Sequence, residues 1–290
     1  MRSIRVRILA ALASRSAIPG LLFPLLLFAM LLTGCHRETR ADAPLTVVTL
    51  NLWHDKQDWP HRQDLIVAGL QAQSPDVIVL QEVLQDAGLP NQAATLAERL
   101  GYRYRFFSVD PPDRARRYGN AILTRAEPLA THEIKLAPLD DYRNAGHVLA
   151  DIGGRRISIY VTHLHHTAEG GAIRARQVED LLAFVAATRG DAPVLIGGDF
   201  NTRADAPELK PLADAFADAF AAAHPGEDVD APERSTLNTH AGHAPLRIDH
   251  VFFPRDAFRV DGARIILDRA DAGGAWPSDH YGVWVRLVPR

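Results

Sequence analysis

The stretch LIGGDFN, residues 195–201, indicates how this chain folds. Its first four residues are apolar or small, as in a buried strand, and they lead directly into Asp199 and, two positions later, Asn201. An ordinary turn would account for this, because Gly, Asn and Asp are common turn residues. The alternative is a strand that carries a polar functional site at its end, and the rest of the sequence decides between the two.

Residues 45–290 alternate between apolar, β-branched runs and segments with helical periodicity. The runs are bounded by Gly, Pro or Asp and are predicted to be strands. The pair Gly153–Gly154 between two such runs predicts a hairpin, so the sheets should contain antiparallel as well as parallel pairs. Helical spacing of apolar residues predicts helices. It appears in residues 61–73, 91–100, 172–188 and 205–222.

The first 34 residues differ in composition from the rest of the chain. A basic start, MRSIRVRILA, is followed by the apolar run LLFPLLLFAMLLTGC, which ends at Cys35. This pattern is typical of a secretory signal, and the run is shorter than the roughly 20 apolar residues that a membrane-spanning helix needs. The residues LTGC resemble the lipobox of bacterial lipoproteins, in which the cysteine is acylated after cleavage.

The lipobox resemblance implies three segments and a location. Residues 1–34 would be a lipoprotein signal peptide, residues 35–44 a polar tether held to a membrane through lipidated Cys35, and residues 45–290 the functional domain. His36 follows the cysteine, where an Asp often retains lipoproteins in an inner membrane. The resemblance therefore implies an exported bacterial lipoprotein of the outer membrane, with its domain in the periplasm or at the surface.

Cleavage would make the chain distinctly acidic. Residues 1–34 hold four of the 32 basic residues and none of the 35 acidic ones, so 28 basic residues would remain and the net charge would be −7. Proteins that bind duplex nucleic acid without sequence preference gain affinity by neutralising phosphates with basic residues. Duplex nucleic acid is therefore a less expected partner than a lipid or another small phosphoester.

Polar residues suited to catalysis occur at six predicted strand ends. Four of these ends follow an apolar run and two precede one. In a mixed sheet, the end of one strand and the start of an antiparallel strand share an edge, so the residues can meet at one rim. Glu and His have no special place in turns, which favours a site over turn chemistry. The residues expected at the rim are Asn51, Glu82, His163, Asp199, Asn201, Asp249, Asp279 and His280.

The donor atoms of this rim are oxygens and two imidazoles, with no thiol. Such oxygen-rich sets suit Mg²⁺, Mn²⁺ or Ca²⁺, and Mg²⁺ typically takes one or two carboxylates and keeps its waters for a phosphate substrate. Glu82 is the first expected ligand. An Asp beside a His can fix its tautomer and let it act as a general base. The pattern therefore predicts a Mg²⁺ site, with Mn²⁺ or Ca²⁺ as alternatives.

Seven motifs resemble, in order, those of the endonuclease/exonuclease/phosphatase superfamily. The resemblance runs from residue 50 to residue 283. It implies an α/β fold, a four-layered sandwich of two packed mixed β-sheets with helices outside, and a metal-dependent phosphoester hydrolase. The motifs are LNL (50–52), LQEV (80–83), YGNAILTR (118–125), VTHL (161–164), GGDFN (197–201), RIDHVF (247–252) and SDHYGV (278–283).

The resemblance implies a role for each residue of the rim. Glu82 would bind the metal, with Asn51 and Asp279 beside it as further metal-binding residues. His280 would act as general base or contact the phosphate, and Asp249 would orient its ring. The cation would offset the charge that develops on the phosphate.

The identity of the general base stays open between Asp199 and His280. Asp199 and Asn201 would position the attacking water and the phosphate. His163 would stabilise the phosphate and is a candidate to protonate the leaving group. The expected chemistry is in-line attack of water on the phosphorus of an ester.

Further residues are expected to contact the substrate. Tyr118 and Asn120 belong to the YGNAILTR motif, and Asn51 adjoins the phosphate as well as the metal. His165 lies two positions after His163 on the predicted strand, so both side chains can line the same rim.

We expect a monomeric, Mg²⁺-dependent phosphodiesterase that acts on a lipid or other small phosphodiester in the cell envelope. A secreted or periplasmic nuclease is the alternative, and a non-catalytic envelope lipoprotein that only binds a partner is the second. The histidines of THLHHTAEGG (162–171) lack the following Asp-His pair of metallo-β-lactamase-type zinc enzymes. No G-x-S-x-G elbow points to a serine hydrolase.

Overall fold

The structure, a computed structural model, describes residues 43–290. The expected signal peptide and the lipidated Cys35 lie outside the described residues, as does most of the expected tether. The division of the chain into these segments therefore stays a prediction. Among the described residues, no helix is long and apolar enough to cross a membrane.

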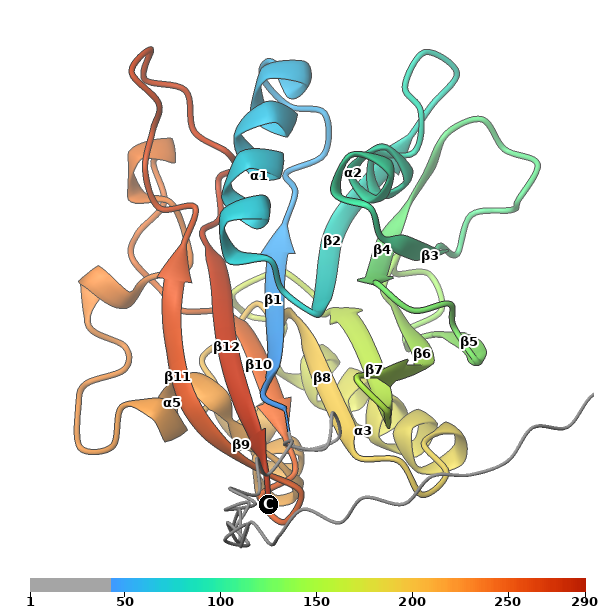
Figure 1. Ribbon diagram of the computed structural model, residues 1–290, viewed down its shortest axis with the longest axis vertical. Coiled ribbons are helices and arrows are strands. Elements are labelled where there is room, and N and C mark those ends of the chain that lie inside the picture. Colours follow the sequence, from blue (N-terminus) through green and yellow to red (C-terminus); the bar gives the residue numbers. More distant parts are fainter. Residues whose placement is uncertain (1–42) are drawn as a thin grey trace, which may run out of the picture. The chain divides into compact units, whose positions relative to one another are not determined.

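The part of the chain that the structure describes contains two six-stranded sheets, each with parallel and antiparallel pairs (Figure 1). Across the first sheet the order is β11 (Phe258–Ile266), β12 (Gly282–Pro289), β1 (Leu45–Asn51), β2 (Val77–Gln85), β4 (Arg117–Thr124) and β3 (Arg103–Phe107). Across the second it is β5 (Ala130–Lys135), β6 (Asn144–Ile152), β7 (Arg155–His163), β8 (Val194–Asp199), β10 (Asp249–Phe253) and β9 (Ala217–Asp218).

The two sheets pack face to face through apolar side chains. Val47 of β1 and Val79 of β2 belong to one buried cluster with Val161 of β7 and Leu195 of β8. The sheets approach closely at Gly197, where an added Cβ would lie 2.5 Å from a methyl carbon of Val79. The first glycine of LIGGDFN is therefore explained by the packing of one sheet on the other.

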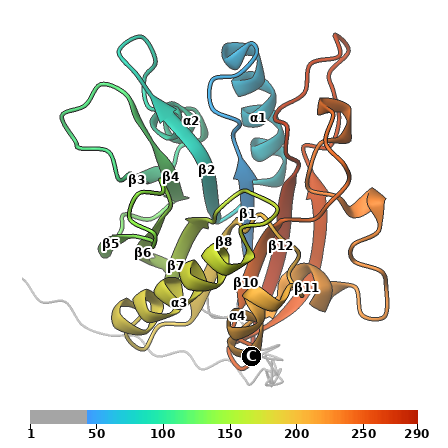
Figure 2. The ribbon, with the colours of Figure 1, turned by 180° about the vertical axis from the view of Figure 1, so that it is seen from behind.

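Helices cover the outer faces of both sheets and complete four layers (Figures 1 and 2). Ile66 and Leu96 of the first two helices pack on the first sheet, whereas Val178 and Leu181 of the third pack on the second. The predicted sandwich of two mixed sheets with helices outside is confirmed. The helices are α1 (Trp59–Gln73), α2 (Gln92–Leu100), α3 (Gly171–Thr188), α4 (Lys210–Ala215) and α5 (Ala219–Ala223).

One of the four predicted helices is wrong. Residues 205–222 do not form a single helix but a 3₁₀ turn (Pro207–Leu209), α4, β9 and α5 in succession. Phe216 is extended, with φ −132° and ψ 156°, and this ends α4. The Asp218 side chain then caps α5 by accepting two backbone N–H groups. Apolar spacing alone could not reveal these breaks.

Candidate active site

Strand pairing in the second sheet aligns three of the predicted residues. β7 runs parallel to β8 with His163 beside Asp199, and β10 runs antiparallel to β8 with Asp249 beside Asp199. Residues paired in this way present their side chains on the same face of the sheet. All three are buried. They lie where β7 and β8 end and β10 begins, which is the shared edge that the sequence predicts.

Asn51, the last residue of β1, connects the first sheet to this row. Its Nδ2 donates to Asp199 Oδ2 at 3.0 Å, and its Oδ1 accepts from the Trp53 backbone N–H at 3.0 Å. Ser278 Oγ donates to the Asn51 carbonyl at 2.7 Å. The fully buried amide therefore ties the rims of both sheets together and fixes the segment that precedes β12.

Glu82 reaches the site through an irregularity of β2. The pairing of β2 with β4 is interrupted between Leu80 and Val83, as in a β-bulge. Glu82 lies in this interruption with φ +55°, a backbone angle uncommon outside glycine. Its Oε2 lies 2.8 Å from His54 Nε2. Burial alone would raise the pKa of Glu82, but the contact with His54, together with the charge of His280 and a hydrogen bond with Asn51, outweighs it and lowers that pKa.

His280 is held by Asp249. The His280 Nδ1 lies 2.8 Å from Asp249 Oδ2, and its Nε2 lies 3.9 Å from Asp199 Oδ2. Burial alone would lower the pKa of His280, but the neighbouring carboxylates, Asp249 above all, raise it to about 10. The imidazole is therefore protonated near neutral pH and carries an N–H at both nitrogens, of which Nδ1 donates to Asp249.

Asp199 occupies the centre of the cluster. Its Oδ2 lies 3.4 Å from His163 Nε2, and its Oδ1 accepts from the Asn201 backbone N–H at 2.9 Å. Burial and the charge of Asp249 raise the pKa of Asp199 to about 7. Burial and the charge of Arg143 hold the pKa of His163 well below its usual value, so this imidazole is neutral.

Glu82 and Asp279 fit a hydrated divalent cation. Burial and the charge of Glu82 both raise the pKa of Asp279, so the two carboxylates repel one another and a shared cation would relieve the repulsion. Their side chains are 20 % and 13 % exposed, which leaves room for the waters that Mg²⁺ retains. His243 Nε2 approaches Asp279 Oδ2 at 3.4 Å.

A second group with metal-binding atoms consists of Asp199, Asp249 and His280, whose ligand atoms lie within 4.8 Å of one another. Their side chains are at most 8 % exposed and already bond to each other and to Asn51. One oxygen, Asp249 Oδ1, is buried without a partner in residues 43–290. This group could hold a metal, but its closed form suits a hydrated ion less well than Glu82 and Asp279 do.

Three predicted site residues bond to neighbouring loops and strands. Asn201 Nδ2 donates to the Leu164 carbonyl at 3.0 Å, and Asn120 Nδ2 donates to the Asn144 side chain at 2.6 Å. His165 Nδ1 lies 2.8 Å from an Asp141 oxygen. Asn201 thus supports the backbone at the rim, and Asn120 and His165 hold neighbouring side chains, while their predicted roles toward water, phosphate and substrate stay predictions.

Tyr118 joins the site from β4. Its hydroxyl lies 3.4 Å from His163 Nδ1, and its ring stacks on His54 with the ring centroids 4.9 Å apart. Buried Arg143 acts electrostatically on both Tyr118 and His163. The sequence contains no signal for Arg143, because an arginine just before a strand is usually a surface residue.

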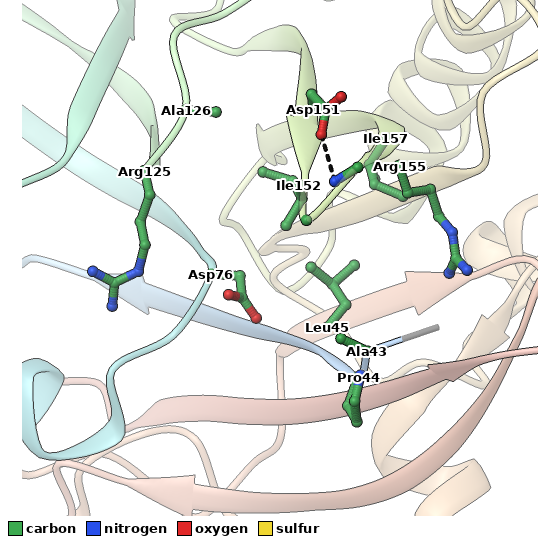
Figure 3. A pocket seen from close by; sticks show the side chains of 12 residues that line it. Ala43, Pro44, Leu45, Asp76, Arg125, Ala126, Asp151, Ile152, Arg155 and Ile157 are labelled. Carbon is green, nitrogen blue, oxygen red and sulfur yellow. Dashed lines mark hydrogen bonds between the residues drawn. The ribbon is translucent and has the colours of Figure 1, made fainter. Parts of the chain in front are cut away.

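Three cavities differ in their relation to this site. One of about 530 Å³ adjoins Tyr118 and Arg143, and one of about 300 Å³ adjoins Trp53 and Ser278. The cavity in Figure 3, about 470 Å³, adjoins Leu45 and the turn between β6 and β7, at the opposite ends of the strands. The first two therefore flank the candidate site, and the third does not.

The order of motifs and the two-sheet fold agree with a family model. The model of the endonuclease/exonuclease/phosphatase family matches residues 48–280. This chain belongs to that family. The family predicted from the seven motifs is thus confirmed.

Curated relatives are identical to this family member at between a quarter and a third of the aligned positions. Nocturnin of Drosophila melanogaster is 27 % identical over 271 residues, which cover 78 % of this chain and 41 % of the relative. Tyrosyl-DNA phosphodiesterase 2 of Mus musculus is 28 % identical over 248 residues, which cover 79 % of this chain and 61 % of the relative. The chain thus spans about half the length of the curated relatives it matches.

Solved structures show the same fold. The human Nocturnin catalytic domain with bound sulfate anion has a TM-score of 0.69 at 22 % identity, covering 85 % of this chain and 94 % of that one. D. rerio TDP2 complexed with a single strand DNA product has a TM-score of 0.69 at 20 % identity, and the match covers 85 % of this chain and 99 % of that one. An endonuclease/exonuclease/phosphatase from Beutenbergia cavernae has a TM-score of 0.67 at 25 % identity, and the match covers 85 % of this chain and 72 % of that one.

Proposed function

We propose that this endonuclease/exonuclease/phosphatase family protein is a Mg²⁺-dependent phosphodiesterase. The observation that carries the proposal is that Asp199, a protonated imidazole and two further carboxylates lie at one edge of the sheets. His280 lies 3.9 Å from Asp199 and is held by Asp249, while Glu82 and Asp279 adjoin the same rim. A base, a cationic donor and a metal site at one edge are the parts that water attack on phosphorus requires.

Asp199 is the proposed general base. Its Oδ2 accepts from Asn51 and lies 3.4 Å from His163 and 3.9 Å from His280, so these neighbours hold the carboxylate in place at the rim. His280 is unsuited to this role because Asp249 holds Nδ1 and keeps the ring charged. Asp199 takes the proton of the attacking water as the new P–O bond forms. The ester P–O bond breaks with its electron pair on the leaving alcohol oxygen, which takes a proton from solvent. His280 donates from Nε2 to a phosphate oxygen.

Glu82 and Asp279 are the proposed metal ligands, with Asn51 beside them. Bound Mg²⁺ would supply positive charge against the phosphate oxygens, and Mn²⁺ or Ca²⁺ would suit the same oxygen donors. The His54 contact keeps Glu82 ionised and ready to bind a cation. His163 is neutral, so it orients Asp199 and the phosphate through hydrogen bonds and does not place a positive charge beside the phosphate.

A phosphodiester is the proposed substrate class. The relative named tyrosyl-DNA phosphodiesterase 2 acts on diesters by its name, and a solved TDP2 holds a single-stranded DNA product. A lipid or other small phosphodiester of the cell envelope remains the substrate expected from the acidic chain and its lipobox. A nuclease is the alternative that these relatives favour.

The decisive experiment compares a chromogenic diester, bis(p-nitrophenyl) phosphate, with the monoester p-nitrophenyl phosphate. The full chain in detergent should hydrolyse the diester in Mg²⁺ and lose this activity in EDTA. Asp199→Asn and Glu82→Gln should each lower kcat/KM by roughly 10²–10⁴-fold, since each removes a group that acts in the transition state.

Thermal unfolding of the same variants provides the control. Asp199→Asn should unfold at or above the temperature of the parent chain, because it removes a buried charge whose pKa is raised. Glu82→Gln should unfold a little below the parent chain, because it gives up the ionised contact with His54 that lowers the pKa of Glu82. A loss of activity that parallels a loss of stability would make both residues structural. Hydrolysis that persists in EDTA would contradict the metal proposal and would favour a different catalytic apparatus.

We also propose that the protein is an exported lipoprotein attached to the outer membrane through Cys35. The basic start, the short apolar run and LTGC support this location. Labelling with a radioactive fatty acid tests it, since the parent chain should take up the label and Cys35→Ser should not. Label on both chains, or on neither, would contradict the anchor.

A further inference from the structure

The cavity of about 530 Å³ beside Tyr118 is lined by basic side chains that the proposed reaction does not use. It opens at the same edge of the sheets as the candidate site, between the start of β4, the segment before β6 and the segment after β7. We call it the Arg143 cavity. Its walls include Arg114, Arg116, Tyr118, Tyr142, Arg143 and His166.

Arg143 is the central observation. Its side chain is 7 % exposed, and no carboxylate of residues 43–290 lies within ion-pair distance of it. Its Nε is buried without a hydrogen-bond partner in the described part of the chain, and one Nη lies 3.4 Å from His166 Nδ1. A buried guanidinium is costly unless an anion or several acceptors pair with it. This side chain therefore lacks an anionic partner.

The opposite wall adds further positive charge. Arg114 makes no ion pair within the described residues, and Arg116 pairs with Asp86 at the exposed surface, at 3.0 Å. The acidic residues of the cavity are already engaged. Asp110 accepts from the Tyr118 backbone N–H at 2.8 Å, and Asp141 lies 2.8 Å from His165. The lining thus holds three arginines and two aspartates, so its formal charge is slightly positive, although the whole chain is acidic.

Tyr118 lines the cavity and also adjoins the candidate site. Its hydroxyl lies 3.4 Å from His163 Nδ1, and His163 Nε2 lies 3.4 Å from Asp199. A substrate whose scissile phosphate meets Asp199 could therefore extend past Tyr118 into the cavity. Arginine is well suited to a phosphate there, because its planar fork can donate two parallel hydrogen bonds.

We propose that the Arg143 cavity binds a second phosphate group of the substrate, next to the one that is cleaved. The proposal rests on the phosphodiesterase function proposed above and narrows its substrate to molecules with at least two phosphates. The second phosphate could be a terminal monoester or a neighbouring diester in a short strand. Tyr142, 60 % exposed at the rim, offers a ring on which a base can stack. A lipid with a single phosphate would leave Arg143 unpaired.

Three thymidine oligonucleotides distinguish a terminal phosphate monoester from a neighbouring phosphodiester as the group bound in the cavity. The first is a dinucleotide with one internal phosphate, the second the same dinucleotide with an added 5′-terminal phosphate, and the third a trinucleotide with two internal phosphates. The full chain in Mg²⁺ should cleave the second or the third with a kcat/KM roughly 10- to 100-fold above the first, as expected for hydrogen bonds between charged groups. The preferred substrate identifies a terminal or a neighbouring phosphate.

Arg114→Gln is the main variant, because Arg114 is at the rim and outside the proposed catalytic machinery. It should reduce, several-fold, the increase in kcat/KM that the second phosphate gives (the gain). It should leave cleavage of the one-phosphate dinucleotide unchanged. Arg156→Gln is the matched control, since Arg156 is an exposed arginine at the other end of β7. It should preserve the gain. Arg143→Lys keeps the charge but not the fork, and should weaken the gain further.

Binding of a fluorescent trinucleotide in EDTA, measured by anisotropy, gives a second readout without turnover. Arg114→Gln should weaken binding several-fold relative to Arg156→Gln, and added salt should reduce the difference. Equal cleavage of all three oligonucleotides, or equal binding by the two variants, would overturn the subsite. If no diester is cleaved while binding still depends on Arg114, the proposed function fails and the anion site stands.

Discussion

Gly198 shows how closely single residues are constrained at this site. An added Cβ would lie 2.1 Å from the Thr162 carbonyl oxygen, a backbone atom of the neighbouring β7. A backbone atom cannot move away without disturbing the pairing of β7 with β8. We expect Gly198→Ala to lower the free energy of unfolding by about 1–3 kcal/mol, measured by urea denaturation. It should also lower activity, because Asp199 is the next residue.

Gly88 provides the control for Gly198. An added Cβ there would meet no atom within 4 Å. Gly88→Ala should therefore change the free energy of unfolding by no more than about 0.5 kcal/mol. Equal destabilisation by the two substitutions would show that the close approach of β7 does not matter.

Asp279 should be needed for activity but should lower the folding stability of the metal-free protein. Burial and the charge of Glu82 raise its pKa, so the ionised carboxylate destabilises the metal-free protein above that pKa. Asp279→Asn removes this charge. In EDTA, the variant should unfold roughly 1–3 °C above the parent chain, while activity in Mg²⁺ should be lost.

The metal dependence of unfolding tests the same residue further. Mg²⁺ should raise the melting temperature of the parent chain, because a ligand that binds the folded state stabilises it. The rise should be absent in Asp279→Asn. A variant that Mg²⁺ still stabilises as much as the parent would place the metal elsewhere, with Asp199, Asp249 and His280 as the next candidate group.

Single residues also show how far the sequence could predict the site. Asp199 and His280 could be placed because each adjoins an apolar strand, and strand ends of a mixed sheet meet at one edge. Arg143 could not, because its burial depends on how β4, β6 and β7 pack together. The Glu82–His54 contact depends on a positive φ that no local pattern signals.

At the scale of elements, α1 fixes two loops of the site. Its Arg62 is 2 % exposed, and a lysine in its place could not make all of its hydrogen bonds, because an ammonium group lacks the planar fork of a guanidinium. Both loops adjoin proposed metal-binding residues, Asn51 on one side and Asp279 on the other. The guanidinium donates to five backbone carbonyls, those of Leu52, Trp53, His54, Lys56 and Pro277.

We expect Arg62→Lys to lower the free energy of unfolding by about 2–4 kcal/mol, because buried carbonyls lose their donors. It should also raise the Mg²⁺ concentration needed for half-maximal activity, since both loops would loosen. Urea denaturation and a Mg²⁺ titration measure the two effects. Arg99→Lys on α2, an exposed arginine paired with Asp64, should change neither. Unchanged Mg²⁺ dependence in Arg62→Lys would show that α1 does not position the site.

The elements also mark where periodicity stops being informative. Residues 61–73, 91–100 and 172–188 each correspond to one helix, because a long apolar stripe at helical spacing seldom arises in any different structure. Residues 205–222 have similar spacing but break twice, at the extended Phe216 and at the Asp218 cap. Short helices that share one apolar face imitate a single long helix in the sequence.

For the whole molecule, the arrangement of two sheets brings distant segments to one rim. Asn51 and Asp199 are far apart in sequence and belong to different sheets, yet their side chains bond at 3.0 Å. The sequence predicted that strand ends meet but not the strand order, because pairing partners depend on contacts between distant segments. The family resemblance supplied the two-sheet sandwich, and the structure confirms it.

The second sheet should also control how stability depends on pH. Its fully buried His147 contacts His132, Ser158 and the Tyr160 ring, none of which is acidic. Burial and the charge of His132 lower the pKa of His147 to about 4. The unfolded chain takes up this proton near pH 6.5, so it binds more protons than the folded chain between pH 6.5 and 4. Stability should therefore fall as pH falls through this window.

The expected slope from His147 is up to about 1.4 kcal/mol per pH unit. Asp199 acts in the opposite direction over part of the same window, because its raised pKa makes the folded chain the stronger proton binder. The comparison must therefore be between the parent chain and His147→Gln, with urea unfolding at pH 7 and pH 5. The variant should lose less stability on acidification than the parent. Equal losses would show that His147 is protonated in the folded chain and that the second sheet tolerates a buried charge there.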